Sequence, residues 1–159
     1  MGQPVAVARP HDLQSWHDDW SGLRVLVLGL GVTGFAVADT LAELGCHVVV
    51  AAHRADDDRA RILPVIGVDL VELATADELP AAFDALDPEL VIVSPGFRPD
   101  HPHVVWARDR GTPVWGDIEL AWRVRDKVTP PAEWVLITGT NGKTTTTQLA
   151  ATMLQEDGR

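Results

Sequence analysis

The chain has 159 residues, of which 46% are hydrophobic and 23% charged, a composition typical of one globular domain or of one domain and the start of another. Its formal net charge of −10 excludes a non-specific nucleic-acid binder, which needs clustered lysine and arginine. A single cysteine (Cys46), no apolar signal-peptide region before Trp20 and no apolar run of membrane-spanning length predict a cytoplasmic protein without disulfides or a membrane partner.

The elements expected along the chain alternate between strands and helices. Residues 1–20 read as a loose leader, with Trp16 and Trp20 packing on the first element. Buried strands are expected where continuous apolar runs occur, over 24–28, 47–52, 68–73, 90–93 and 113–115. Helices are expected over 33–44, 59–66, 76–86, 103–110 and 118–125. Such alternation predicts an α/β fold, a Rossmann-like doubly wound parallel sheet with helices on both faces.

The first strand is followed by the glycine loop Gly29–Gly34, which has the spacing G-x-G-x-x-G and opens a helix. Glycines at these positions allow a tight turn, a close approach of the backbone to a diphosphate and close helix–strand packing. An NAD site also requires a carboxylate at the end of the second strand, where the chain instead has His53 and Arg54. A diphosphate ligand other than NAD is therefore favoured, although Arg54 leaves NADP open.

A second glycine loop, 138–145, follows a break that contains Pro130 and Pro131. An apolar strand is expected over 134–137 and a helix from about Thr144, which together would be the first βα unit of a P-loop ATPase domain. The loop is a shortened variant of the general P-loop pattern, because Ile137 stands where that pattern has its first glycine. We divide the chain into a first domain over 1–116 and a linker helix with the start of a second domain over 117–159. Such a unit needs further strands, so we expect the chain to be the front of a longer protein.

The second loop, Thr-Gly-Thr-Asn-Gly-Lys-Thr-Thr, resembles the ATP loop of the Mur ligase family, whose members form amide bonds through an acyl-phosphate. Three further stretches carry the resemblance, Val-Leu-Gly-Leu-Gly-Val-Thr-Gly at 27–34, Val-Ser-Pro-Gly-Phe at 93–97 and Gly-Asp-Ile-Glu-Leu-Ala at 116–121. Their combination is most similar to the branch of the family that adds D-glutamate to UDP-N-acetylmuramoyl-L-alanine in cytoplasmic peptidoglycan synthesis. The resemblance covers the chain from about Gly22 onward, but only about the first third of such an enzyme.

The resemblance implies two sets of site residues and the cofactors ATP and Mg²⁺. The UDP end of the substrate would be bound by Gly31, Val32, Thr33, Gly34, His53, Arg54, Ser94, Pro95 and Gly96. ATP would be bound by Gly139, Thr140, Asn141, Gly142, Lys143, Thr144 and Thr145, with Lys143 and Thr144 catalytic and Thr144 on the metal. The D-glutamate pocket would lie beyond Arg159, so the fragment alone is expected to be inactive. The full-length enzyme is expected to be monomeric, whereas the fragment could self-associate through its exposed apolar strand.

Three alternatives remain open at this point. A neighbouring family member that adds L-alanine, lysine or diaminopimelate shares most of these motifs. An NADP-dependent oxidoreductase would use the first glycine loop and Arg54, but leaves the second loop unexplained. A non-catalytic UDP-sugar sensor would need only the first domain. Cys46 is expected to be a buried inert thiol, and His101 and His103, which flank a proline, are expected at the surface.

Overall fold

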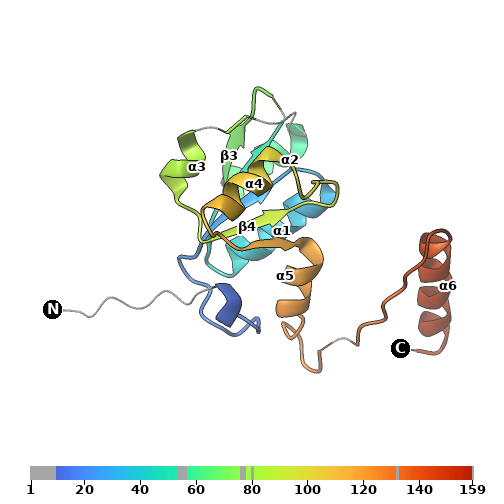
Figure 1. Ribbon diagram of the computed structural model, residues 1–159. Helices are drawn as coiled ribbons and strands as arrows, with labels where there is room; N and C mark the ends of the chain where they lie inside the picture. Colours follow the sequence, from blue (N-terminus) through green and yellow to red (C-terminus); the bar gives the residue numbers. More distant parts are fainter. Residues whose placement is uncertain (1–9, 54–56, 76–77, 80, 132, 159) are drawn as a thin grey trace.

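The computed structural model describes residues 10–53, 57–75, 78–79, 81–131 and 133–158, which form an alternating series of strands and helices (Figure 1). In chain order the elements are η1 (Pro10–Asp12), β1 (Arg24–Leu28), α1 (Val32–Glu43), β2 (His47–Ala52), α2 (Asp57–Ile62), η2 (Leu63–Ile66), β3 (Asp69–Glu72), α3 (Ala81–Leu86), β4 (Leu90–Val93), α4 (Pro102–Asp109), β5 (Val114–Gly116), α5 (Asp117–Arg123) and α6 (Lys143–Glu156).

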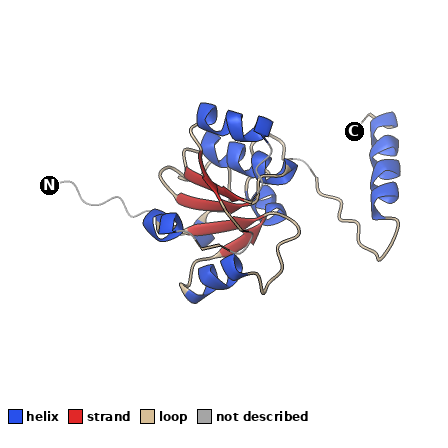
Figure 2. Ribbon diagram, turned by 90° about the horizontal axis from the view of Figure 1, so that it is seen from above, coloured by secondary structure: helices blue, strands red, loops and turns tan. Residues whose placement is uncertain are grey.

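The described strands form one parallel sheet in the order β3-β2-β1-β4-β5. Strand β1 is central, with Val25 opposite Val48 on β2 and opposite Leu90 on β4. The chain runs from β1 outward through β2 to β3 and then crosses to β4 on the other side of β1. Helices cover both faces of the sheet (Figure 2), which confirms the predicted doubly wound α/β architecture.

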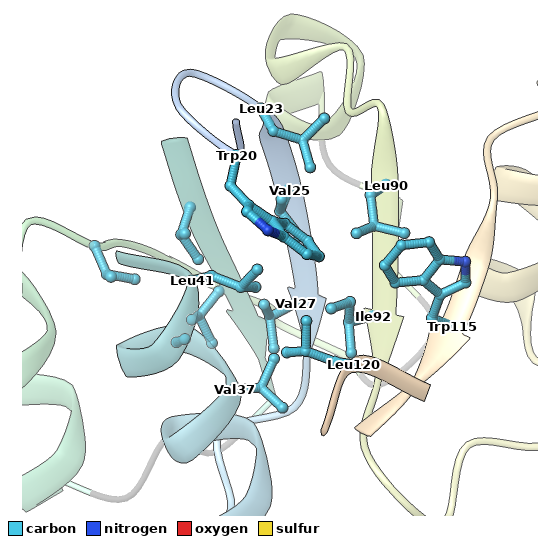
Figure 3. Close-up of a cluster of buried hydrophobic side chains, with 14 of the residues drawn as sticks. Trp20, Leu23, Val25, Val27, Val37, Leu41, Leu90, Ile92, Trp115 and Leu120 are labelled. Carbon is cyan, nitrogen blue, oxygen red and sulfur yellow. The ribbon is translucent and has the colours of Figure 1, made fainter. Parts of the chain in front are cut away.

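Alternate residues of each strand face two separate hydrophobic cores. One core joins Val25 and Val27 of β1 to Leu41 of α1 and Leu120 of α5 (Figure 3). The other core joins the intervening residues of β1 to α3 and α4, and its buried members are Leu26, Leu28, Val49, Ala51, Leu73, Phe83, Leu86, Val91 and Ala107. Burial on both faces explains why the central strands are continuous apolar runs rather than alternating ones.

The leader after Pro10 is packed against the sheet rather than loose. Trp20 is almost completely buried, and its ring meets that of Trp115 on β5 edge-on, with centroids 6.5 Å apart (Figure 3). Arg123 at the end of α5 donates to the carbonyl oxygen of Leu13 at 2.5 Å, and its guanidinium lies 4.1 Å from the centroid of the Trp115 ring. Trp20 shares a hydrophobic core with Val25 and Val27 of the first strand, β1, as expected, whereas the Trp16 ring lies beside Lys127, which follows α5.

Two predicted helices differ from the observed ones. The segment 59–66 divides into the end of α2 and the 3₁₀ helix η2, which has Pro64 in its first turn. Proline has no N–H to donate within α2, so it is suited to the first turn of a new helix. Of the helix expected over 76–86, residues 76, 77 and 80 lie outside the described residues, and α3 is observed from Ala81 onward.

The strand expected over 134–137 is not formed in the described part of the chain. Val135 and Leu136 are exposed, and no described strand pairs with them. A strand exists only where a neighbour accepts its backbone hydrogen bonds, so an apolar run without a partner strand stays irregular. The helix that follows, α6, is formed, but none of its described residues is buried, and it lies away from the sheet in both views (Figures 1 and 2). Within the described ranges no helix is long and apolar enough to cross a membrane.

Candidate functional site

The first glycine loop and the loop after β4 meet at the point where the sheet reverses its strand order. Strands β1 and β4 are adjacent, and the next residue of each hydrogen-bonds to a neighbouring strand: Gly29 N–H donates to Ala51 O at 2.8 Å, and Ser94 N–H donates to Leu28 O at 3.1 Å. Ligands of open α/β sheets bind in the crevice outside the carboxyl ends of the strands at such a reversal. The topology thus brings Gly31–Gly34 and Ser94–Gly96, which are distant in sequence, to one edge.

The glycines of the first loop differ in what surrounds them. A Cβ added at Gly34 would lie 2.0 Å from the carbonyl oxygen of Gly29, so the start of α1 can pack on the loop only without a side chain there. Gly29 has φ +97°, a conformation that other residues rarely adopt. Gly31 precedes α1 as its N-cap, has no side-chain cap, and would have no atom within 4 Å of an added Cβ. The backbone at Gly31 is therefore open to a ligand at the positive end of a helix.

Ser94 lies directly behind these glycines. Its hydroxyl oxygen is buried and has no hydrogen-bond partner among the described residues. It lies 3.0 Å from the Cβ positions of both Gly29 and Gly34. A buried hydroxyl without a partner is costly, and a ligand is one way to satisfy it. Pro95 and Gly96 are exposed beside it, with Gly96 at φ +116°.

A pocket of about 240 Å³ opens at the end of β2, next to the first loop. It is lined by Gly29, Leu30, Ala51, Ala52, His53, Leu73, Phe97 and His101. The His53 ring is held by a contact of 3.1 Å between Nδ1 and the carbonyl oxygen of Leu73. His53 therefore lines this pocket, whereas Arg54 lies outside the described residues.

The two histidines around Pro102 were expected at the surface, and this is wrong for His103 and incomplete for His101. His103 is fully buried in the first turn of α4, where its Nε2 lies 2.5 Å from the carbonyl oxygen of Glu78. His101 is half-buried and lines the pocket. The sequence feature that bears on both positions is Pro102, which favours the first turn of a helix. This placement makes His101 the N-cap of α4 and puts His103 in its first turn.

The second loop contains two glycines with positive φ angles directly before α6. Gly142 has φ +78° at the N-cap of α6, and Gly139 has φ +154°, so both positions favour glycine. Lys143 is the first residue of α6, and its Nζ donates to the carbonyl oxygen of Gly139 at 2.6 Å, which holds the ammonium over the loop. Thr144 follows in the same exposed turn. The residues present thus fit a nucleotide triphosphate: open backbone N–H groups, a lysine and a hydroxyl at a helix N-terminus.

No cluster of three or more histidine, cysteine or acidic side chains that could hold a metal exists in the described ranges.

A doubly wound parallel sheet with a glycine loop at its strand reversal, followed by a second glycine loop that opens a helix, defines a protein of Rossmann-like architecture. The family model described as "Mur ligase MurD-like, N-terminal domain" matches residues 23–116. The chain belongs to this family, as the resemblance of its motifs indicated.

Relatives named UDP-N-acetylmuramoylalanine--D-glutamate ligase match nearly the whole chain. The protein from Leifsonia xyli subsp. xyli is 60% identical over 152 residues, which are 92% of this chain and 29% of that protein. The protein from Tropheryma whipplei (strain Twist) is 47% identical over 152 residues, 96% of this chain and 30% of that protein. The chain thus spans less than a third of the length of these relatives.

Solved structures of Mur ligases share the fold. The UDP-N-acetylmuramate-alanine ligase of Thermotoga maritima superposes with a TM-score of 0.53 at 29% identity, covering 84% of this chain and 29% of that one. A second Mur ligase, from Neisseria meningitides, has a TM-score of 0.54 at 17% identity, covering 64% of this chain and 30% of that one, and shows the fold alone.

Proposed function

We propose that this chain is the substrate-binding part of an ATP-dependent ligase that adds D-glutamate to UDP-N-acetylmuramoyl-L-alanine in cytoplasmic peptidoglycan synthesis. The observation that carries the proposal is the strand reversal, where the buried Ser94 hydroxyl, unpartnered among the described residues, lies beside Gly29 and Gly34 and the backbone at Gly31 is open. The relatives named for this activity support it, because their identity to this chain extends across both glycine loops.

The UDP end of the substrate would occupy the first domain, residues 1–116. Gly31, Val32 and Thr33 would present backbone N–H groups at the start of α1 to the diphosphate, and Gly34 permits that approach by its close packing on Gly29. Ser94, with Pro95 and Gly96, would close the crevice from the β4 side. His53, with Arg54 after it in the sequence, would border the base at the end of β2.

The nucleotide triphosphate would bind the second loop, within 117–159. Backbone groups of Gly139–Gly142 would surround its phosphates, Lys143 would neutralise the outer phosphates, and Thr144 would contribute its hydroxyl to Mg²⁺, with Thr140 and Thr145 flanking the cradle. ATP, when bound with Mg²⁺, would supply the phosphoryl group that activates the carboxylate for attack by an amine. Lys143 already lies over the loop, so its charge needs no large rearrangement to act.

Phosphate release by the full-length protein tests the proposal. Release is expected only when UDP-N-acetylmuramoyl-L-alanine, D-glutamate, ATP and Mg²⁺ are all present. Lys143→Ala should lower kcat/KM by about 100-fold or more, since a preorganised charge contact contributes roughly 3 kcal/mol. Lys127→Ala, which removes an exposed lysine that pairs with Glu43 outside the loop, is the matched control and should leave turnover unchanged. Equal turnover with L-alanine or a diamino acid in place of D-glutamate would contradict the assignment.

A further inference from the structure

The described part of the leader lies against the end of α5, from which the chain continues to the second loop (Figure 1). We call residues 10–16 of the leader the leader strap. Neither the strap nor the end of α5 falls within residues 23–116, which the family model matches. The contact between them is therefore not part of the domain that the family model describes.

The guanidinium of Arg123, the last residue of α5, is one of the two side chains that hold the strap. Its Nη1 donates to the carbonyl oxygen of Leu13 at 2.5 Å, and its Nε and Nη2 each lie 2.8 Å from Oε1 of Glu119. Its Cζ lies 4.1 Å from the centroid of the Trp115 ring, and its side chain is only 12% exposed. Because all three nitrogens have a partner and a ring covers one face, the orientation of this side chain is fixed.

The second side chain is the carboxylate of Asp126, which reaches the hydrophobic core through Ser15. The N–H of Ser15 donates to Oδ2 of Asp18 at 2.9 Å, and its carbonyl oxygen accepts from Nε1 of Trp20 at 2.8 Å. Its hydroxyl donates to Oδ2 of Asp126 at 2.5 Å, and the N–H of Trp16 donates to the other oxygen of that carboxylate at 2.7 Å. Since Trp20 belongs to the core, hydrogen bonds join the core to Asp126 without interruption.

Asp126 lies where the chain leaves the first domain. It is half-buried, whereas residues 127–131, which follow it toward the second loop, are exposed. The direction in which the chain leaves the domain is therefore set at the carboxylate that the strap holds. The strap is also remote from the first glycine loop, because Trp20 precedes β1 and the loop follows β1 at the other end of that strand.

We infer that the leader strap fixes this exit direction, and that Arg123 and Asp126 are positioning residues for phosphoryl transfer between the two sites. The outer phosphate of ATP and the substrate carboxylate must meet in line, although they would be bound through different loops. A linker released from the strap would sample more separations, and fewer molecules would be ready to react. This inference rests on the proposed function, because it assigns a role in that reaction.

Steady-state kinetics of the full-length protein with Asp126→Ala test the inference. The kcat for phosphate release is expected to fall about tenfold, because small misplacements of reacting groups are costly, while KM for UDP-N-acetylmuramoyl-L-alanine stays within about twofold. Ser15→Ala should lower kcat by a smaller factor. The double variant should be no slower than Asp126→Ala, because both changes break the same hydrogen bond.

Two charge-conserving substitutions provide a matched pair. Arg123→Lys keeps the positive charge but loses the planar fork, so it should also lower kcat without raising KM. Arg125→Lys is the control, because Arg125 donates to the carbonyl oxygen of Trp122 within α5, rather than to the strap, at 2.7 Å. It should leave kcat and KM unchanged.

A distance measurement tests the strap independently of turnover. Spin labels on Val65→Cys and Gln148→Cys, both at exposed positions, report the separation of the first domain from α6 by pulsed electron paramagnetic resonance. The Cys46 thiol, whose pKa is raised to about 12 by burial, stays unlabelled. The distribution of distances in the full-length protein should be broader in Asp126→Ala than in the wild type or in Arg125→Lys.

The outcomes separate this inference from the function on which it rests. Absence of D-glutamate-dependent turnover in the wild type would overturn the proposed function, and the distance distribution would then decide on the strap. Normal wild-type turnover with an unchanged kcat in Asp126→Ala, or an unchanged distribution of distances, would overturn only the inference. An equal loss of kcat in Arg123→Lys and Arg125→Lys would overturn it as well.

Discussion

Gly34 is the residue at which the first loop tolerates least change. An added methyl group would lie 2.0 Å from the carbonyl oxygen of Gly29, so either α1 or the loop would have to move. We expect Gly34→Ala to lower the free energy of unfolding by about 2 kcal/mol, a typical effect of overpacking. Urea denaturation followed by circular dichroism measures this change.

Gly31→Ala is the matched control for Gly34→Ala. A Cβ at Gly31 meets no atom within 4 Å, so the free energy of unfolding should change by only a few tenths of a kcal/mol. The methyl group would instead stand where the diphosphate approaches, and UDP affinity should fall. Equal destabilisation by the two substitutions would show that the packing of Gly34 has been misjudged.

Cys46 is expected to be unreactive while the chain is folded. Burial raises the pKa of its thiol to about 12, because the thiolate loses its hydration. An unfolded cysteine has a pKa of about 8.5, so this group's contribution to stability is complete below that pH and is lost as the pH rises toward 12. Labelling with a chromogenic disulfide at pH 8 should be slow in buffer and immediate in denaturant. Immediate labelling of the folded chain would contradict the burial.

At the scale of elements, one carboxylate connects the leader to the end of α5. Asp126 accepts hydrogen bonds from Ser15 Oγ at 2.5 Å and from Trp16 N–H at 2.7 Å, and the Ser15 bond is the main cause that lowers the pKa of Asp126. A lowered pKa stabilises the folded state above the unfolded value of about 3.9, and this contribution is lost as the pH falls through the folded pKa.

We therefore expect acid to release this part of the leader. The NMR signal of the Trp16 amide should shift between pH 5 and pH 2 in the wild-type chain, and Asp126→Asn should remove that transition. Asp109→Asn changes an exposed aspartate of α4 and serves as the control. A Trp16 transition that persists in Asp126→Asn would show that another group holds the leader.

Helix α6 and the segment before it should be the least protected part of the described chain. None of the described residues of α6 is buried, and Met153 is 71% exposed. Helices without a packed face are marginal in water. Hydrogen exchange should therefore be fast over 134–154 and slow over 25–28, 48–51 and 90–93. Strong protection of 134–154 at low concentration would mean that this segment packs on a surface that the structure does not show.

The sequence predicted those elements whose cause is local. Strand β1 and the end of α1 at Gly45 followed from an apolar run and a glycine in the left-handed position. The prediction of a strand over 134–137 was wrong, because an apolar run carries no information about whether a partner strand is present. The pocket role of His101 was missed because α4 and β2 are brought together only by the sheet order.

The residues of the candidate site also divide into those with a local cause in the sequence and those that only the fold brings together. The turn at Gly29–Gly34 and its close packing could be predicted, since the glycine spacing itself encodes them. The proximity of Ser94 to Gly34 could not be predicted from residue spacing, because it depends on β4 crossing to lie beside β1. The contacts of the His53 and His101 rings depend on single backbone groups of Leu73 and His103, which no sequence pattern indicates.

At the scale of the whole molecule, the two glycine loops have different surroundings. The first is built into a buried sheet between two hydrophobic cores, and its geometry is fixed by packing on both sides. The second has its backbone geometry in place, although the helix behind it is exposed. We therefore expect this chain to bind the UDP end of the substrate by itself and to bind ATP only weakly.

The central claim is that the crevice at the strand reversal is a site for a UDP-linked substrate, and calorimetric titration of the chain tests it most directly. UDP-N-acetylmuramoyl-L-alanine should bind with a stoichiometry of one, and more tightly than NADP or NAD. Gly31→Val should abolish this binding, because its side chain would occupy the approach of the diphosphate. Tighter binding of NADP than of the UDP-linked substrate would contradict the account.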